Sequence, residues 1–412
     1  MDDVYIVGVG MTPFGKLFHH SVKSLTEEAV RAALKDGQVV LEALQAIYFA
    51  NTGQGVLENQ HLVRGQIALR AMGVEQTPVI NVENACASAS SAFQSACLAV
   101  ASGQVETALA VGVEKMVIED RARMFSLFDC AWDVTTASEN MARLSALVTP
   151  PEELDASGVR SLFMDIYALL ARFHMQHFGT TQEQLAVVSA KNHKHSVLNP
   201  LSQYRDAISV DQVLAAKMVS WPLTLPMCSP VSDGAAAAVV VSGSLLSEDQ
   251  RRRAVRVRAC EMGIGSDRPA EAFDRHLCRI AAQRAYERAG VGPEDMDLAE
   301  VHDATAFAEI QQTENLGFCE IGDGGRLAAS GATALGGRIP VNPSGGLQSK
   351  GHPIGATGLA MIHELVVQLR GEAGGRQVAD ARMGIAENGG GFHGYEEAVA
   401  AITILEREGK SY

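Results

Sequence analysis

Residues 84–103, NACASASSAFQSACLAVASG, and residues 349–371, SKGHPIGATGLAMIHELVVQLRG, share one plan. Each is a turn of small residues that opens into an apolar helix. The sequence around them repeats as well, because residues 4–10 and 255–263 are β-rich runs and the segments 24–34 and 277–289 have a helical period. The order of these elements predicts a chain built from two similar halves.

Further matches extend the repeat along each half. Residues 41–51 match residues 297–307, since both are apolar strands that run into polar residues, and residues 106–115 match residues 380–389. We therefore predict two β-α-β-α-β halves around a mostly parallel sheet covered by helices, the α/β class. The expected boundaries are 1–250 and 251–412, with RRR at 251–253 marking the junction.

A central segment, residues 118–225, has no counterpart in the second half. It is polar, helical in pattern and interrupted by prolines, and SPVSDGAAAAVVVSG at 229–243 then returns the chain to a buried strand. We predict that this insertion is a mainly helical loop domain that covers a substrate.

Composition limits the classes of function. The 412 residues are 47% hydrophobic and 20% charged, and 34 basic against 48 acidic residues give a net charge of −14. This balance disfavours nucleic acids and anionic membrane surfaces as partners. The seven scattered cysteines, the acidic N-terminal sequence and the lack of a long apolar run predict a cytoplasmic protein without a membrane span.

Two residues in the repeated turns form a candidate nucleophile and base. Cys86 should lie at a helix N-terminus, where the macrodipole and free N–H groups favour a thiolate. His352 occupies the equivalent turn of the second half, so a local two-fold axis would bring the thiol and the imidazole together. The alternatives are a buried cysteine that packs as a small hydrophobe, and a helix cap whose glycine loop binds an anion.

Two further stretches could border the same site. His302 and Asp303 end a strand, where α/β sheets commonly form a crevice, although such a pair is often structural. ENGGGFHG at 387–394 is a glycine turn that could direct backbone N–H groups at a substrate oxygen, or be an ordinary surface turn. Asp233-Gly234 is interpreted as a turn that enters a buried strand.

No metal site is expected. The pairs His174-x-x-His177 and His193-x-His195 have no convincing third ligand, so we interpret them as solvated helix faces.

These motifs together resemble the thiolase superfamily, in particular its sterol-carrier-protein-2-type branch. The resemblance covers most of the chain and includes VYIVGVGMTPFGK, NACASAS, PVSDGAAA, EVHDATAF and NPSGGLQSKGHPIGATG. It implies a five-layered αβαβα fold of two similar halves with a loop domain, and a homodimer or homotetramer.

The resemblance also implies roles for individual residues. Cys86 would accept an acyl group from a coenzyme A thioester, and His352 would activate it. His302 would complete an oxyanion site, while Gly389 and Cys86 would donate backbone N–H groups to the tetrahedral intermediate.

Two departures from the family pattern concern proton transfer. The branch has an HDCF motif, but Ala304 stands here in place of its cysteine. Alignment of the glycine triplet places Glu387 where other thiolases have a second catalytic cysteine. Claisen chemistry needs an acid and a base for the α-proton, so His352, His393 or Glu387 are the candidate substitutes.

The leading prediction is an acyl-CoA C-acyltransferase that forms an acyl-enzyme on Cys86 and passes the acyl group to coenzyme A or to a carbon nucleophile. No resident cofactor is expected, because the coenzyme A thioesters are substrates. The alternatives are a retro-aldolase that works with a zinc-ribbon/OB-fold partner, and a non-catalytic subunit of the same fold. Candidate cations for coenzyme A are Arg121, Arg123, Arg160, Arg172 and Lys191.

Overall fold

The structure is a computed structural model, and it describes residues 3–149 and 161–408. Nine of its strands form one twisted sheet in the order β3-β2-β4-β7-β1-β8-β11-β10-β9. The strands of this sheet are β1 (Val4–Met11), β2 (Ala46–Ala50), β3 (Val79–Val82), β4 (Thr107–Glu114), β7 (Gly234–Ser242), β8 (Val255–Ile264), β9 (Leu298–Glu300), β10 (Met383–Gly390) and β11 (Val399–Arg407). The remaining strands, β5 (Met218–Ser220) and β6 (Leu223–Thr224), pair with each other.

The sheet order shows the internal repeat. Outward from the centre, β1, β7, β4, β2 and β3 of the first half correspond to β8, β11, β10, β9 and an isolated bridge at Val341 in the second half. The directions correspond too, since β2–β4 and β9–β10 are parallel while β1–β7 and β8–β11 are antiparallel. The two halves meet through two residue pairs between β1 and β8.

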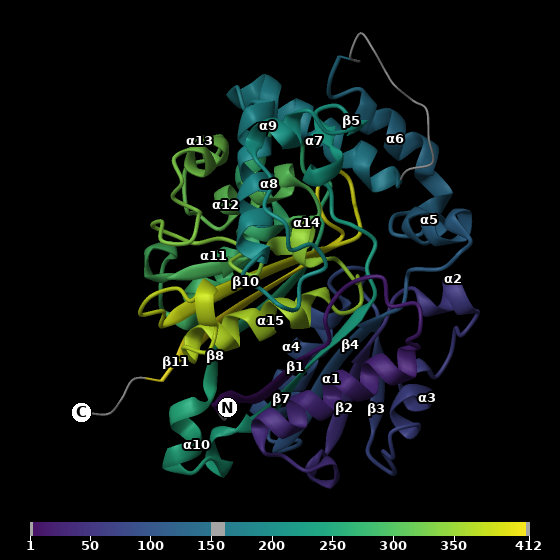
Figure 1. Ribbon diagram of the computed structural model, residues 1–412, viewed down its shortest axis with the longest axis vertical. Helices are drawn as coiled ribbons and strands as arrows, with labels where there is room; N and C mark the ends of the chain where they lie inside the picture. Colours follow the sequence, from purple (N-terminus) through teal and green to yellow (C-terminus); the bar gives the residue numbers. More distant parts are fainter. Residues whose placement is uncertain (1–2, 150–160, 409–412) are drawn as a thin grey trace.

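Helices separate the two halves into layers. The long helices of the layers are α1 (Val22–Gly37), α4 (Ser88–Ala101), α11 (Leu277–Ala289) and α15 (Thr357–Leu369). Helix α1 covers the outer face of the first half and α11 that of the second, whereas α15 contacts both β7 and β10 and packs against α4 between the halves (Figure 1). The predicted five-layered αβαβα arrangement is confirmed.

The prediction of a mostly parallel sheet is wrong. Five of the eight strand pairs in the sheet are antiparallel. In each half the last strand, β7 or β11, is inserted between the first strand and β4 or β10, and it runs against both neighbours. An apolar strand buried on both faces has the same sequence pattern in either direction, so the sequence could not distinguish them.

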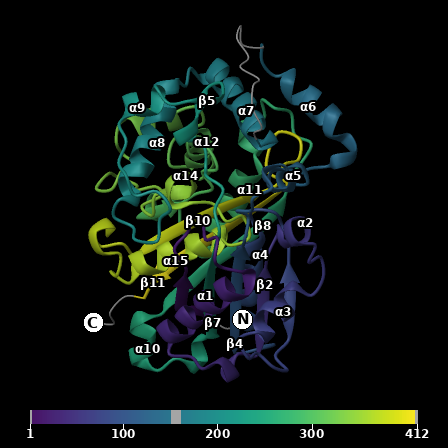
Figure 2. The same ribbon diagram turned by 45° about the vertical axis from the view of Figure 1, so that its right-hand side comes forward.

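The segment between β4 and β7 is mainly helical, as predicted. It holds α5 (Arg121–Asp129), α6 (Ala137–Ser145), α7 (Leu162–Phe178), α8 (Gln182–Ser196) and α9 (Val210–Leu214). These helices gather at one end of the molecule, where α8 packs on helices of the second half and α5 lies beside α2 of the first half (Figures 1 and 2). Helix α7 begins at Ser161, whose side chain accepts a hydrogen bond from Phe163 N, and ends at Gly179 in the left-handed conformation.

The shorter helices connect these parts. They are α2 (Gln54–Glu58), α3 (Arg64–Arg70), α10 (Glu248–Arg253), α12 (Ala306–Asn315), α13 (Gly324–Ala329) and α14 (Gly346–Lys350). Helices α12, α13 and α14 of the second half all contact α8, and so join the central segment to the sheet. Within the described residues, no helix is long and apolar enough to cross a membrane.

Candidate active site

Cys86 lies in a tight turn between β3 and the first residue of α4. Ala85 has a φ of 48°, a left-handed conformation that costs a non-glycine residue about 1–2 kcal/mol. The turn is fixed by Ser88, whose hydroxyl donates to Ala85 O and accepts from Asn84 N. The strained turn presents the thiol of Cys86 to the cavity, and the residue as a whole is partly buried.

His352 occupies the corresponding loop before α15. Its Nδ1 lies 2.7 Å from the hydroxyl oxygen of Thr357, and that hydroxyl donates to Pro353 O at 3.0 Å. Because the Thr357 hydroxyl has a single proton, Nδ1 of His352 must be the donor in the other contact. Nε2 therefore has the free lone pair that a general base needs.

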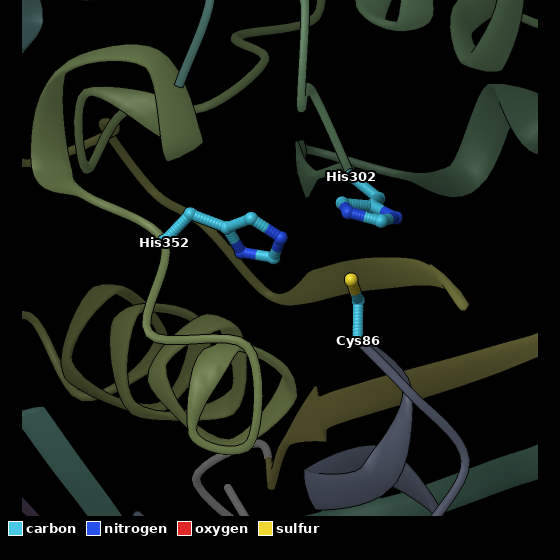
Figure 3. Close-up of side chains that lie close together, drawn as sticks. All are labelled: Cys86, His302 and His352. Carbon is cyan, nitrogen blue, oxygen red and sulfur yellow. The ribbon is translucent and has the colours of Figure 1, made fainter. Parts of the chain in front are cut away.

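His302 completes a group of three side chains. Cys86 Sγ and one ring nitrogen each of His302 and His352 all lie within 4.8 Å of one another, and the two rings are 5.2 Å apart (Figure 3). The side chain of His302 is buried, and neither ring nitrogen has a hydrogen-bond partner among the described residues. Since buried polar atoms are nearly always paired, this imidazole is available to a substrate.

The local electrostatics differ from the sequence-based expectation. Burial, followed by the carboxylates of Glu114 and Glu83, raises the pKa of Cys86 to about 12. Burial lowers the pKa of His302 to about 4, and burial next to His302 and Lys350 lowers the pKa of His352 well below its usual range. The helix N-terminus therefore does not keep a thiolate in the resting site, and the neutral thiol lies beside two neutral imidazoles.

A buried carboxylate holds the two catalytic turns together. Glu114, at the end of β4, accepts from Thr52 N, Gly53 N and Gly355 N. The hydroxyl of Thr52 donates to Ala85 O in the Cys86 turn, while Gly355 belongs to the His352 loop. Because these bonds span both halves of the chain, they fix the separation of the two catalytic turns.

Asp303 and Asp233 have structural roles. The carboxylate of Asp303 accepts from Leu347 N and from the Gln348 side chain, so it supports the loop that leads to His352. Asp233 is more than the turn residue predicted from sequence. Its buried carboxylate accepts from Met116 N and forms an ion pair with Lys115.

The glycine triplet lies beside the Cys86 turn. Gly389 is in β10, paired with Ala400, and the side chain of His302 lies beside it. A Cβ on Gly390 would be 2.4 Å from Asn84 O, so only glycine permits this approach. The N–H of Gly391, two residues beyond the predicted Gly389, faces the Cys86 thiol and lowers its pKa.

The candidate substitutes for the second cysteine lie in different places. Glu387 is buried outside the cavity, where its carboxylate accepts from His302 N and from the Cys278 thiol. His393 is half-exposed and contacts Asp267. Ala304 lines the cavity beside His302 and provides no proton-transfer group.

A cavity of about 430 Å³ opens in front of the thiol. Cys86, His302, His352 and Gly391 form one end of it, and the remaining wall is mostly apolar. The aromatic part of that wall comes from α5 and α7 and consists of Phe125, Phe128, Phe163 and Tyr167. The cavity therefore offers space for an apolar group next to a reactive thiol.

Among the described residues, the cations that line the cavity are Arg121 and Lys217. Arg121 was predicted as a coenzyme A contact, but Lys217 was not. Arg123 bonds to Val56 O and Asn59, while Lys191 is buried against Glu309.

Arg172, a further candidate for a coenzyme A contact, does not line the cavity. Arg172 bonds to Thr149 O, and Arg160 lies outside the described residues.

The interpretation of the histidine pairs as solvated is wrong for His174, His193 and His195, whereas His177 is exposed as expected. His174 is buried between Thr180 and Glu314, and His195 is held between Asn342 O and Leu335 N. His193 is also buried. The central segment packs against the second half on the face that carries them, which a helix pattern alone does not reveal.

Sequence reasoning missed the wall that the central segment provides. Phe163 and Tyr167 are one helical turn apart on α7, and their spacing was indistinguishable from that of core residues. Lys217 stands alone in a connecting segment, so no motif identifies it. The apolar periodicity of α7 was the one signal available, and it could not show that part of the helix faces a cavity.

Two α/β halves of one plan, with a cysteine and a histidine brought together from equivalent helix N-termini, define the class of thiolase-type acyltransferases. The comparisons with known proteins agree. The family model "Thiolase, N-terminal domain" matches residues 4–219, and "Thiolase C-terminal domain-like" matches residues 268–407. The chain therefore belongs to the thiolase family.

Individual relatives place it further within that family. The chain is 39% identical to an acetyl-CoA acetyltransferase of Methanothermobacter thermautotrophicus, over 99% of this chain and 100% of the relative. It is 37% identical to human sterol carrier protein 2, over 93% of this chain and 69% of the relative. The solved structure of an "Ltp2-ChsH2(DUF35) aldolase" matches with a TM-score of 0.76 and 23% identity, covering 100% of this chain and 99% of that one.

Proposed function

We propose that this thiolase-family protein transfers acyl groups between coenzyme A thioesters through an acyl-enzyme on Cys86. The observation that carries the proposal is the convergence of the Cys86 thiol with the two imidazoles. His352 has its lone pair on Nε2, because Nδ1–H is bonded to Thr357. A thiol beside a correctly protonated base at the end of a cavity is the arrangement that covalent acyl transfer needs.

The reaction would proceed in two halves. In the first, Nε2 of His352 takes the proton of Cys86 as its sulfur attacks the acyl carbonyl carbon, since the raised pKa of the thiol disfavours a free thiolate. The bond from that carbon to its leaving group then breaks, which leaves a thioester on Cys86. In the second half, a coenzyme A thiolate or a carbon nucleophile attacks this thioester and releases Cys86.

Two sets of donors could stabilise the oxyanions. His302 is neutral and unpartnered, so one ring N–H can bond to a thioester oxygen. The N–H groups of Cys86 and Gly391 face the thiol and would bond to the oxygen of the intermediate formed there. Gly389 remains a predicted donor from the resemblance. Loss of one such donor typically lowers the rate about 100- to 1000-fold.

The walls of the cavity support an apolar acyl group. Phe125, Phe128 and Phe163 follow one another at ring separations of 6.4 and 6.5 Å. We propose that this wall holds an acyl chain or ring larger than acetyl. Arg121 and Lys217 are the proposed partners of the coenzyme A phosphates, because they bring positive charge to a mostly apolar lining.

The alternative activity is a retro-aldol cleavage with a zinc-ribbon/OB-fold partner. A solved relative of the same fold is described as an aldolase, at an identity that indicates fold alone. An aldol cleavage needs no acyl-enzyme, whereas this chain retains both Cys86 and His352. A non-catalytic subunit would have had no need to keep the pair. Acyl transfer is therefore favoured.

We also propose a homodimer joined at the edge of the first half. Strand β3 is the outermost strand of the sheet, and β2 is its partner among the described residues. Ile80 on β3 is 50% exposed, and Leu62 is 75% exposed. An apolar unpaired edge invites another strand, and a second copy of this chain satisfies it symmetrically.

Intact-protein mass spectrometry tests the acyl-enzyme. The wild type and Cys86→Ala are exposed briefly to a panel of acyl-CoAs, and free coenzyme A is then added to remove the label. We expect an adduct of the acyl mass on the wild type alone, which coenzyme A removes. An adduct that persists in Cys86→Ala, or no adduct from any thioester, would contradict the proposal. It would favour the retro-aldolase or the non-catalytic subunit.

A further inference from the structure

The cavity must contain a group that exchanges the α-proton of the substrate. In thiolysis the carbon–carbon bond breaks to leave an enolate, and that carbon must receive a proton. Glu387 and His393 do not line the cavity, and His352 already serves the thiol in the proposed first half-reaction. Cys86, His302 and His352 already have roles in the proposed first half-reaction. Among the other described residues of the lining, the uncharged side chains with a titratable proton are Tyr167 and Cys228.

Cys228 is bound to its own turn. Its thiol donates to Thr224 O at 3.6 Å, and burial raises its pKa to about 12. Proton transfer from Cys228 would first require breaking this contact, so it is the weaker candidate.

Tyr167 is a buried residue in the wall of the cavity. It lies on α7, its side chain is 3% exposed, and its ring packs edge-on against Phe392 at 5.2 Å. Phe392 directly follows Gly391, whose N–H faces the Cys86 thiol. The phenol hydroxyl has no hydrogen-bond partner among the described residues, although the residue lines the cavity.

Tyr167 lies close enough to Cys86 and to a buried cluster of acidic groups for their charges to act on it. Cys86 acts on it from the cavity, while Glu397, Glu387 and Cys278 act on it from the buried cluster behind His302. That cluster is continuous, because the Cys278 sulfur lies 3.4 Å from a carboxyl oxygen of Glu387 and 3.5 Å from one of Glu397, and its single proton can be donated to either.

Burial, followed by the charges of Glu397, Cys86 and Glu387, raises the pKa of Tyr167 well above its ordinary value. The phenol is therefore protonated at rest. Such a weak acid still protonates an enolate readily, because the α-carbon of a thioester is far less acidic than a phenol.

We propose that Tyr167 is the catalytic acid/base for the α-carbon, in place of the second cysteine of the family. This inference rests on the proposed function. In thiolysis, His352 takes the Cys86 proton, the C2–C3 bond breaks, and the enolate carbon takes the phenol proton. The site then holds acyl-Cys86, an imidazolium and a tyrosinate.

The second half-reaction restores all three groups. The tyrosinate takes the proton of the incoming coenzyme A thiol, and the resulting thiolate attacks the acyl carbon. The Cys86 sulfur leaves and takes back the proton from His352. Condensation is the reverse, so a tyrosinate is produced when Cys86 is acylated and then removes the α-proton of the second acyl group.

Tyr167→Phe separates Cys86 acylation from proton transfer at the α-carbon, because it keeps the ring packing and removes the hydroxyl. Once Cys86 has been acylated, acetyl-CoA in excess is incubated with the enzyme in D₂O, and deuterium in its acetyl group is followed by mass spectrometry. The rate of Cys86 acylation is measured alongside. Tyr48→Phe is the matched control, since Tyr48 is a buried tyrosine on β2 that does not line the cavity.

We expect Tyr167→Phe to lower α-exchange about 100-fold or more, because the α-carbon then has no base. Cys86 acylation should change by less than about threefold, because a thiolate is a good leaving group and can depart without the phenol proton. Tyr48→Phe should match the wild type in both rates. Exchange that persists in Tyr167→Phe, an equal fall of both rates, or a wild type that acylates without exchanging would each overturn the inference. A wild type that does neither overturns the proposed function as well.

Discussion

At the residue scale, the site depends on groups that stay neutral at rest. The thiol of Cys86 has a raised pKa, and the imidazoles of His302 and His352 have lowered ones. All three shifts have burial as their largest cause. Charge is therefore created only when a substrate enters and proton transfer begins, at the position where the backbone N–H groups of Cys86 and Gly391 can stabilise it.

Thr357 should fix the tautomer of His352. Thr357→Val removes the acceptor for Nδ1–H, so the proton can move to Nε2 and the base is lost in part of the molecules. We expect Cys86 acylation to slow about tenfold, because a tenfold change in rate corresponds to the net free energy of about one hydrogen bond. Thr357→Ser keeps the hydroxyl and should restore the rate, measured by intact mass. A Ser variant as slow as Val would show that the methyl packing matters instead.

Glu387 should make the protein less stable in mild alkali. Its pKa is raised to about 8 by burial, then by Glu397, against 4.5 for a free side chain. The folded state thus binds one more proton than the unfolded state between these values, and its stability falls as the pH rises through 8. Between pH 6.5 and 8.5 the loss is up to about 2 kcal/mol.

Urea unfolding at the two pH values measures this loss. Glu387→Gln cannot ionise, so it should lose less stability than the wild type over the same interval. Glu114, whose pKa is about 7, shifts both proteins equally and cancels in the comparison. An identical pH dependence in the two proteins would refute the assignment.

At the element scale, the site is a consequence of how α4 and α15 pack. The helices cross near their N-termini, where Gly358 lies against Ser90. Ser90 also donates to Asn388 on β10, so both turns are tied to the glycine triplet. The thiol and the base are therefore held by the same helix contact that closes the core between the two halves.

Gly358→Ala tests that contact. The added Cβ would lie 2.0 Å from Ser90 Oγ and 2.6 Å from Asn388 Oδ1, so the helices must separate. We expect a loss of about 1–3 kcal/mol in the free energy of unfolding, measured in urea. Gly15→Ala is the control, because nothing lies within 4 Å of its Cβ position. Equal stability of the two variants would contradict the packing argument.

At the scale of the whole molecule, the edges of the nine-stranded sheet differ. One edge ends on β9 with the bridge at Val341, whereas the other ends on β3 with exposed apolar residues. Because of this difference, we propose that a second copy of the chain binds at the β3 edge.

Ile80→Lys should weaken that dimer. A charge on an edge strand opposes pairing with another strand, so the mass from light scattering should move from dimer towards monomer. Ile264→Lys, at an exposed position on β8, is the control and should leave the mass unchanged. A monomeric wild type, or an unaffected Ile80→Lys, would exclude this interface.

The sequence by itself determined the repeated elements and the residues that begin them. The small-residue turns before α4 and α15 predicted where Cys86 and His352 would lie, because a helix N-terminus has a local signature and two like halves impose a common geometry. The five layers follow from the same repeat, since each apolar helix must be buried against a sheet.

The tertiary structure alone decided the rest. The antiparallel insertion of β7 and β11, the burial of His174 and the aromatic wall of α7 all depend on contacts between segments far apart in the chain. The pKa of Cys86 is another example, because the burial that raises it is produced by the surrounding fold, while the helix N-terminus that would lower it is local. Local patterns record propensity and periodicity, whereas cavities and pKa values arise from what the fold places around each residue.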